Sequence, residues 1–432
     1  MARSATDSRF ASALAEELAE GVLERFLRYV VIDTQSDPDS TSYPSTAKQL
    51  DLSRLLVDEL RAIGLSEVEL TEYGYVLATV PGTVPGTPTV GLIAHVDTAP
   101  GTSGTNVEPI VHRDWQGQPI RLPGDASQLL DPADMPGLAQ KVGHDLVTTD
   151  GTTLLGADDK AGVAIIVTAA EYLLADERPR ATLRVGFTVD EEVGKGTDHF
   201  DLGAFGADFA YTFDGSGLGE VEVETFSAYQ LVLTITGVGV HPGSGKGRLV
   251  NALKLLARVI EGLPGERLSP ETTEERQGFV HPERMTGGSS RATLWLIARD
   301  HVDAALEEHV ELVRSIAAEV VGREPRASFT LEVNEQYRNM RPALDRHPEV
   351  VEAADEAIRR AGIEPVRSIT RGGTDGARLT EKGLPTPNLF TGGQNYHSVC
   401  EWASVQDMAA AAATAVELVR LWGEPDRLGR SG

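Results

Sequence analysis

The sequence predicts amphipathic helices that alternate with short apolar strands. One block, in which the order of helices and strands differs, interrupts this alternation. Helical periodicity with a buried stripe predicts helices, and short apolar runs between turn residues predict buried strands. The alternation of the two predicts an α/β fold, a mixed sheet flanked by helices. The expected helices are residues 10–30, 47–63, 160–174, 348–361 and 405–422, and the expected strands are residues 75–80, 90–96, 182–189 and 209–213.

The interrupting block begins near residue 225. Its expected elements are a strand (229–236), a helix (249–263), two strands (278–285 and 292–298), a helix (302–320) and a last strand (327–333). The order βαββαβ is that of a complete ferredoxin-like α+β unit. We therefore expect residues 1–225 and 338–432 to form one domain and residues 226–337 to be inserted into it.

Charge and composition exclude several classes of partner. The formal net charge is −26, which repels nucleic acid phosphates and anionic membrane surfaces. The single cysteine, Cys400, excludes an internal disulfide and a thiolate zinc site, so a metal would need His, Asp and Glu ligands. The N-terminal stretch lacks an apolar core and no run of eighteen apolar residues occurs, so we expect a cytoplasmic protein.

Two adjacent carboxylates, Asp158 and Asp159, stand between a glycine and the start of an apolar helix in the run GTTLLGADDKAG. A buried, uncompensated anion costs several kcal/mol, so such a pair calls for a strong positive partner. A metal ion is the strongest available partner.

Further candidate ligands follow apolar strands or lie in glycine-bounded loops. His95 ends one strand, and Asp97 is placed to hold its second ring nitrogen. An ordinary buried His–Asp pair is the alternative. The next strand ends in three acids, of which one would bind metal and one would accept a proton, or all three would be solvated. The residues that share this placement are His95, Asp158, Glu192, Asp214 and His397.

Other catalytic schemes lack their motifs. The sequence has no HExxH, which excludes a thermolysin-like single zinc site, and no GxSxG nucleophile turn. The run GSGKG around Lys246 is not a phosphate-binding loop, because Val240 stands where the first glycine belongs and Gly247 where Ser or Thr is required.

Seven segments in their order and spacing resemble the peptidase T group of the zinc-dependent M20 metallopeptidase family, over residues 25–419. They are HVDT, GTTLLGADDKAG, VDEEVGKG, YTFDGSGLGEVE, VHPGSGKGRLVNA, RGGTDGARL and GLPTPNLFTGGQNYH. The resemblance implies an aminopeptidase that removes the N-terminal residue of tripeptides. It also implies a zinc-binding α/β domain with an inserted lid domain that forms a homodimer.

The resemblance implies two zinc ions per chain and a role for each candidate residue. His95 and Asp214 would hold one ion, Glu192 and His397 the other, and Asp158 would bridge them. Glu191 would be the general base and acid, and Asp97 would orient His95. The remaining implied residues are His241, which would stabilise the oxyanion, and Arg299 and Arg371, which would bind substrate.

Two other functions fit the same motifs. Another M20-type hydrolase, such as a dipeptidase, a carboxypeptidase or an amidohydrolase of N-acyl amino acids, would share every ligand. A non-catalytic binding protein on the same fold is the alternative of another class. The expected partner is a small peptide with a free N-terminus, with neither nucleic acid nor membrane involved.

Overall fold

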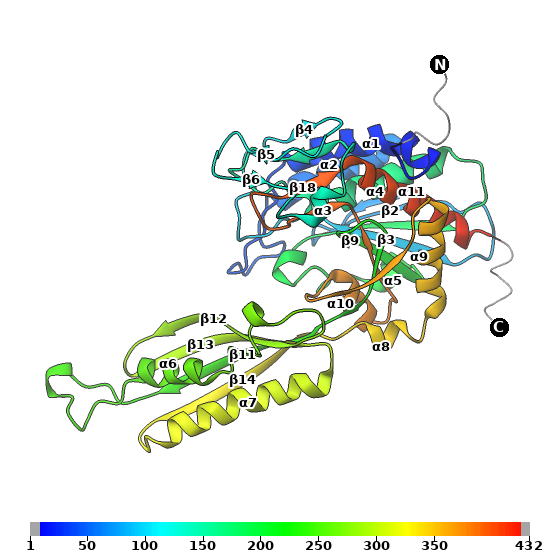
Figure 1. The fold of residues 1–432 in the computed structure, drawn as a ribbon. Helices are drawn as coiled ribbons and strands as arrows, with labels where there is room; N and C mark the ends of the chain where they lie inside the picture. The colour runs from blue at the N-terminus through cyan, green and yellow to red at the C-terminus, as the bar shows by residue number, and fades with distance from the viewer. Residues whose placement is uncertain (1–8, 425–432) are drawn as a thin grey trace. The chain divides into compact units, whose positions relative to one another are not determined.

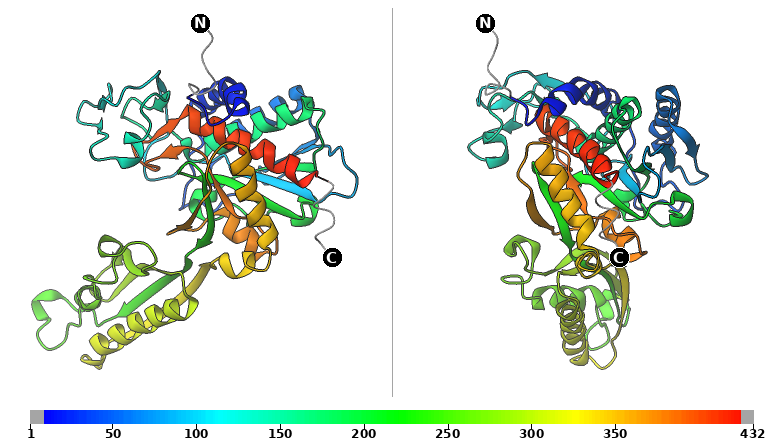
Figure 2. Two further views of the ribbon diagram at one scale, coloured as in Figure 1. Left: turned by 45° about the vertical axis from the view of Figure 1, so that its right-hand side comes forward. Right: turned by 90° about the vertical axis from the view of Figure 1, so that its right-hand side faces the viewer.

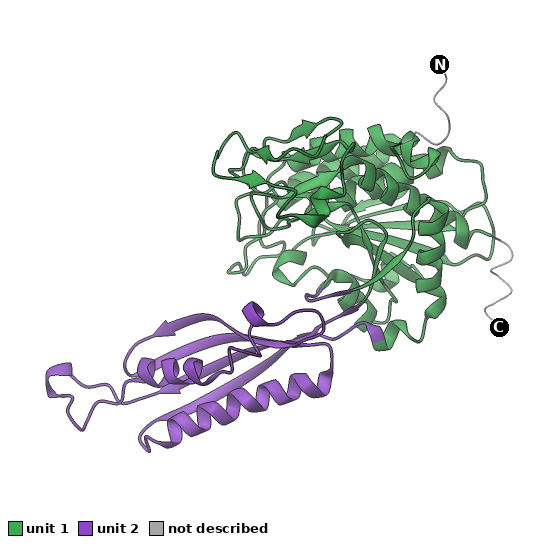
Figure 3. Cartoon of the chain, in the orientation of Figure 1, with its two compact units in different colours: residues 1–223, 342–368, 374–432 green, residues 224–341, 369–373 purple. Residues whose placement is uncertain are grey.

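The computed structural model describes residues 9–424, which form two compact units (Figure 3). Unit 1 contains the residues up to Val223, Pro342–Ser368 and the residues from Thr374 on, and unit 2 contains Glu224–Arg341 and Ile369–Gly373. The expected inserted block, residues 226–337, lies within unit 2. The roles expected of the two domains, catalytic and lid, stay predictions.

The large sheet positions the candidate site. Counted over residues 9–424, it has eight strands in the order β1-β2-β8-β3-β9-β16-β10-β15. Strand β3 pairs in parallel with β8 on one side and with β9 on the other, and β9 pairs in parallel with β16. The carboxyl ends of these four strands therefore meet at one edge, where ligands bind in open α/β sheets. The bounds are β1 Ser66–Leu70, β2 Val76–Val80, β3 Thr89–His95, β8 Thr182–Thr188, β9 Phe209–Gly215, β10 Glu220–Thr225, β15 Val366–Thr370 and β16 Asn388–Phe390.

Four long helices of unit 1 pack side by side (Figures 1 and 2): α1 Ala13–Val30, α4 Ala157–Ala175, α9 Pro348–Arg360 and α11 Val405–Trp422. Helices α4 and α11 also pack on β3, and most of their residues are buried, as expected of apolar central helices. Helix α2 (Gln49–Ile63) packs on β1 and β2, and α10 (Asp375–Glu381) packs on β9. The short helices are α3 Pro136–Ala139, α5 Leu202–Phe205 and α8 Arg341–Leu344.

The polar stretch after residue 99 forms short strands, of which β7 pairs with the C-terminal part of the chain, β4 pairs with β7, and β5 and β6 pair with each other. In the sheet β17-β18-β7-β4, strand β18 pairs with β7, and Trp402 and Leu146 share a small buried core with Trp115. This stretch thus packs on the segment that carries His397. The bounds are β4 Ile110–His112, β5 Ile120–Arg121, β6 Leu129–Leu130, β7 Leu146–Thr148, β17 Gly393–Gln394 and β18 Trp402–Ser404.

Unit 2 has the expected element order, and its sheet is antiparallel throughout in the order β12-β13-β11-β14. Alternate residues of β11, namely Leu231, Leu233 and Ile235, belong to the core that α6 and α7 cover. The predicted ferredoxin-like α+β fold is therefore confirmed. The bounds are β11 Ser227–Thr236, α6 Ala252–Gly262, β12 Phe279–Gly287, β13 Arg291–Asp300, α7 Asp303–Gly322 and β14 Ser328–Tyr337, with short 3-10 helices at Pro242–Ser244 (η2) and Pro270–Thr272 (η3).

Within residues 9–424, the helices are too short or too polar to cross a lipid bilayer.

Candidate metal centre

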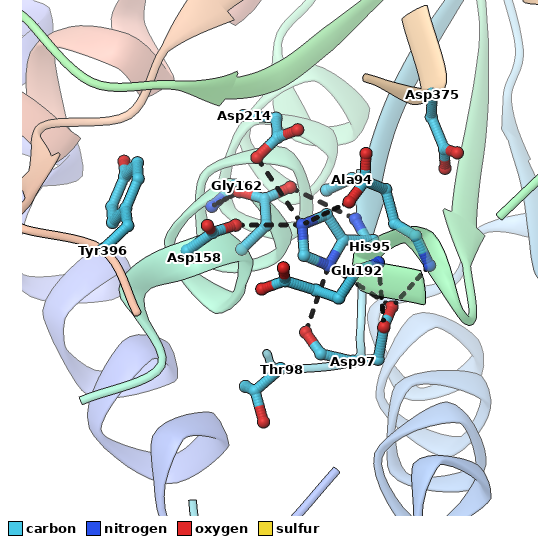
Figure 4. Close-up of polar contacts among 12 residues, drawn as sticks. Ala94, His95, Asp97, Thr98, Asp158, Gly162, Glu192, Asp214, Asp375 and Tyr396 are labelled. Carbon is cyan, nitrogen blue, oxygen red and sulfur yellow. Dashed lines mark hydrogen bonds and ion pairs between the residues drawn. The ribbon is translucent and has the colours of Figure 1, made fainter. Parts of the chain in front are cut away.

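The candidate ligands of unit 1 converge where the parallel strands end. His95 is the last residue of β3, Asp214 is the second-to-last residue of β9, and Glu192 lies in the short helix η1 (Glu191–Val193) that follows β8. Figure 4 shows Asp158 and Asp214 both directed at the imidazole of His95. Residues separated by up to about three hundred positions along the chain thus meet at one point.

Asp158 lies between two imidazoles and offers one carboxylate oxygen to each. Its Oδ1 is 3.0 Å from His95 Nε2, and its Oδ2 is 3.1 Å from His397 Nε2. Each imidazole has a second acid beside it, Asp214 Oδ1 at 3.5 Å from His95 Nε2 and Glu192 Oε2 at 3.0 Å from His397 Nε2. The five side chains therefore form two sets of three donor atoms that share one carboxylate.

A left-handed turn decides which of the three consecutive acids reach the centre. Asp190 has φ +60, and its carboxylate accepts hydrogen bonds from the backbone N–H and the hydroxyl of Ser45 and from Gln49 Nε2. The Asp190 carboxylate is therefore bound to Ser45, before α2, and to Gln49, the first residue of α2. The turn directs Glu191 and Glu192 to the site, Glu191 with Oε2 at 4.0 Å from His95 Nε2.

Asp97 is buried and connects the His95 strand to the acidic turn. Its backbone carbonyl accepts from His95 Nδ1 at 3.1 Å, with its carboxylate at 3.4 Å, which leaves Nε2 facing Asp158. The carboxylate also accepts the backbone N–H groups of Glu191 and Glu192, at 3.0 and 3.2 Å. Asp97 thus fixes the imidazole orientation, as carboxylates and carbonyls do for ligating histidines, and also the position of both acids.

The crowding of buried acids shifts their pKa values. Burial, and then the charge of Asp158, raise the pKa of Glu192 to about 8 and that of Asp214 to about 7. Hydrogen bonds to Asp158 and Glu192 raise the pKa of His397 to about 11. Burial opposes ionisation of Asp158, but the hydrogen bonds from His397 and His95 hold its pKa below the usual range. In the metal-free chain, protons bound to these side chains therefore supply positive charge at the position where a bound cation would supply it.

The donor set fits divalent cations. Ligand atoms of four-coordinate zinc lie about 3.3 Å apart, because Zn–N and Zn–O bonds are about 2.0–2.2 Å long. The four separations between an imidazole nitrogen and a carboxylate oxygen, 3.0–3.5 Å, agree with this spacing. In addition, Glu192 Oε1 is buried with no hydrogen-bond partner in the described part of the chain, and a cation would satisfy it.

Among the described residues, two groups of three have ligand atoms that all lie within 4.8 Å of one another: His95, Asp158 and Glu192, and His95, Asp159 and Asp214. The Asp159 carboxylate is already engaged, with Oδ2 accepting the His95 N–H and Oδ1 accepting the Gly162 N–H, both at 3.1 Å. Asp159 therefore holds the backbone of β3 against α4. The two adjacent carboxylates thus differ in their contacts: Asp159 binds backbone N–H groups, whereas Asp158 faces the imidazoles of His95 and His397.

Three residues near the centre were not predicted from the sequence: Glu401 and Asp375, which are buried, and Tyr396, which is partly buried. Glu401 accepts backbone N–H groups beside Asp158, Tyr396 donates to the carbonyl of Gly215, and Asp375 accepts from Thr188. Asp375 follows two glycines in RGGTDG, a usable signal, whereas Glu401 lies in an unremarkable polar turn.

The other predicted residues, His241, Arg299 and Arg371, belong to unit 2. His241 is exposed, and its Nδ1 accepts the N–H of Gly243 in η2. Arg371 donates to the carbonyls of Glu275 and Gln277, and Arg299 donates to the carbonyl of Arg371. These contacts hold loops of unit 2, and the substrate roles of all three residues stay predictions.

Gly162 sets the distance between α4 and β9. A Cβ at this position would lie 2.0 Å from the carbonyl oxygen of Phe213 and 2.4 Å from Asp159 Oδ1. We expect Gly162→Ala to push α4 away from β9 and to cost about 1–3 kcal/mol, the usual cost of overpacking. Thermal unfolding of the metal-free chain should show a midpoint several degrees lower, with Gly101→Ala, which meets nothing within 4 Å, as the control. An unchanged midpoint for Gly162→Ala would contradict this close contact.

Comparison with known proteins extends over nearly the whole chain. Residues 145–421 match the model of "Peptidase family M20/M25/M40". The chain is 45% identical over 407 residues to the peptidase T of Geobacillus thermodenitrificans (strain NG80-2), covering 94% of this chain and 99% of that protein. It is also 45% identical over 405 residues to the peptidase T of Exiguobacterium sp. (strain ATCC BAA-1283 / AT1b), covering 93% and 98%.

Solved structures show the same fold. The crystal structure of aminopeptidase PepT from Bacillus cereus ATCC 10987 superimposes with a TM-score of 0.73 at 23% identity, covering 94% of this chain and 99% of that chain. A tripeptidase from Staphylococcus aureus subsp. aureus Mu50 has a TM-score of 0.74 at 22% identity, with coverage of 94% and 98%. The chain belongs to the M20 family of metallopeptidases, and within it to the peptidase T group.

Proposed function

We propose that the protein is a dinuclear zinc aminopeptidase that removes the N-terminal residue of tripeptides. The observation that carries this proposal is the position of Asp158, whose two carboxylate oxygens each face a different imidazole with a further acid beside it. The peptidase T relatives support the choice of a peptide substrate.

Each zinc ion would have one imidazole and one acid of its own. His95 and Asp214 would hold the first, His397 and Glu192 the second, and Asp158 would bind both. When bound, the two ions lower the pKa of a water molecule and polarise the scissile carbonyl.

Glu191 would move the proton. Its side chain lies beside the two donor sets without belonging to either, and its backbone N–H is fixed by Asp97. Burial, and then neighbouring acids, including Asp214 and Asp375, raise its pKa well above the ordinary value in the metal-free chain. Glu191 would accept a proton from the attacking water and deliver it to the leaving amine, as one residue serves as base and then acid.

Three residues of unit 2 have roles that are implied by the resemblance to the M20 family. His241 would stabilise the oxyanion, and Arg299 and Arg371 would bind the substrate carboxylate or backbone, for which the guanidinium fork is suited. Unit 2 would serve as the lid and as the surface of a homodimer, and the protein would act in the cytoplasm.

Chelation tests the dependence on metal. We expect dialysis against a chelator to abolish tripeptide hydrolysis and two equivalents of zinc per chain to restore it, because all proposed ligands belong to one shared centre. Metal content is measured by plasma mass spectrometry alongside the rate of hydrolysis. Full activity of a chain shown to be free of metal would refute the proposal.

The substrate class is tested with three matched compounds. A tripeptide with a free N-terminus should be cleaved much faster than its N-acetylated form, because an aminopeptidase requires the free amine, and faster than the dipeptide formed from it. Preference for the N-acetylated form would favour an amidohydrolase, and preference for the dipeptide would favour a dipeptidase. Hydrolysis of none of them by the zinc-loaded chain would favour a binding protein.

A further inference from the structure

Glu401 binds the backbone of the turn that carries Asp158. Its side chain is 1% exposed, and Oε2 accepts the N–H groups of Leu155 and Gly156, at 2.7 and 2.8 Å. Its Oε1 accepts the N–H of Asp158 itself at 3.1 Å. One carboxylate thus receives three backbone donors from four consecutive residues.

The turn depends on an acceptor from outside. Although α4 starts formally at Ala157, Asp158 and Asp159 have non-helical dihedral angles, with ψ of 104 and 34. The N–H groups that precede a helix have no partner within it and must be satisfied elsewhere, because a buried, unpaired N–H is costly. Glu401 supplies this acceptor, so the direction of the Asp158 carboxylate depends on Glu401.

Glu401 lies four residues after His397 in the same loop. His397 adopts a left-handed conformation with φ +61, which is uncommon for a residue other than glycine, so its conformation requires support from its surroundings. Within this loop the His397 carbonyl accepts from Thr102 Oγ1 at 2.7 Å, and Tyr396 donates its hydroxyl to the Gly215 carbonyl at 3.0 Å. Glu401 adds the link between this loop and the Asp158 turn.

We propose that Glu401 is a positioning residue that locks the Asp158 turn to the His397 loop and thereby sets the affinity of the centre for its cations. The Glu401 carboxylate fixes the Asp158 turn relative to the His397 loop, and these two segments would together hold the second zinc. The first zinc shares only Asp158 with this arrangement, so the second zinc depends on Glu401 more strongly. This inference rests on the dinuclear centre proposed above.

The variant that tests it is Glu401→Gln. The glutamine has the same size, but its amide group offers one acceptor oxygen and turns an NH₂ donor toward the backbone donors of the turn. We expect the affinity for the second zinc to fall about 10–100-fold, the usual effect of losing a group that supports metal ligands. The two dissociation constants are measured on the purified full chain by competition with a chromophoric chelator.

Two further variants separate positioning from a loss of stability. Asp145→Asn is the matched control, because Asp145 is also a buried carboxylate of unit 1 and accepts the backbone N–H of Asp114. Its zinc affinity should equal that of the unmodified chain. Glu401→Asp keeps the charge on a shorter side chain, and its affinity should lie between those of the unmodified chain and Glu401→Gln.

The outcomes distinguish this inference from the proposed function. If the unmodified chain binds two zinc ions and Glu401→Gln binds both with the same constants, the positioning role is overturned while the dinuclear centre stands. Equal losses in Glu401→Gln and Asp145→Asn would also overturn it. If the unmodified chain binds no zinc, the dinuclear centre fails, and the positioning role fails with it.

Discussion

Replacing Glu191 by glutamine is expected to lower kcat about 10²–10⁴-fold, the contribution of a general base, and to leave two zinc ions bound. Glu191 lies 4.0 Å from His95 Nε2 and outside both donor sets, so the centre does not need its charge to hold metal. Glutamine has the same shape but cannot accept a proton. Steady-state kinetics with a tripeptide, combined with the metal content of the same sample, measures both quantities.

The neighbouring acid provides the control for this result. Glu192→Gln changes the same chemical group one residue later, but Glu192 Oε2 lies 3.0 Å from His397 Nε2 within a donor set. This variant should lose the second zinc, whereas Glu191→Gln should not. A Glu191→Gln enzyme with near-normal kcat, or one that has lost its metal, would contradict the assignment of the proton to Glu191.

Replacing Asp158 by asparagine is expected to remove both zinc ions and at least 10³-fold of the activity, since one carboxylate serves both donor sets. Asparagine has only one acceptor atom in place of two, and its NH₂ group would face one of the imidazoles. The metal content after dialysis and the residual rate are the measurements.

Asp159→Asn tests the competing set of ligands. Because Asp159 already accepts two backbone N–H groups, this variant should weaken the packing of α4 on β3 more than it weakens metal binding. If Asp158→Asn kept both ions and Asp159→Asn lost them, the ligand would be Asp159, and the division of the pair described above would be wrong.

Elements with strong local patterns were predictable from the sequence. The long helices and the central strands β3, β8 and β9 lie within a few residues of the expected ranges, because each buries an apolar stripe or run that the sequence shows directly. The βαββαβ order of unit 2 was predictable for the same reason. The strand β16 was not, since its three residues form a strand only through their pairing with β9 and β10.

The candidate site was predictable as a set of side-chain types but not as a geometry. His95, Asp158 and Asp214 stand at the ends of strands or at the start of a helix, and this position made them candidate metal ligands. The turn at Asp190, which decides which acids face the centre, depends on Ser45 and Gln49, about 140 residues away. The role of Glu401 likewise depends on backbone N–H groups, which no sequence pattern reveals.

The place of β16 in the sheet bears on how the proposed centre holds together. Strand β9, which carries Asp214, pairs in parallel with β16 (Asn388–Phe390), and His397 follows only a few residues later. Local opening of this strand pair would therefore move the His397 loop away from Asp214, so the proposed centre would hold both ions only while β16 stays in the sheet.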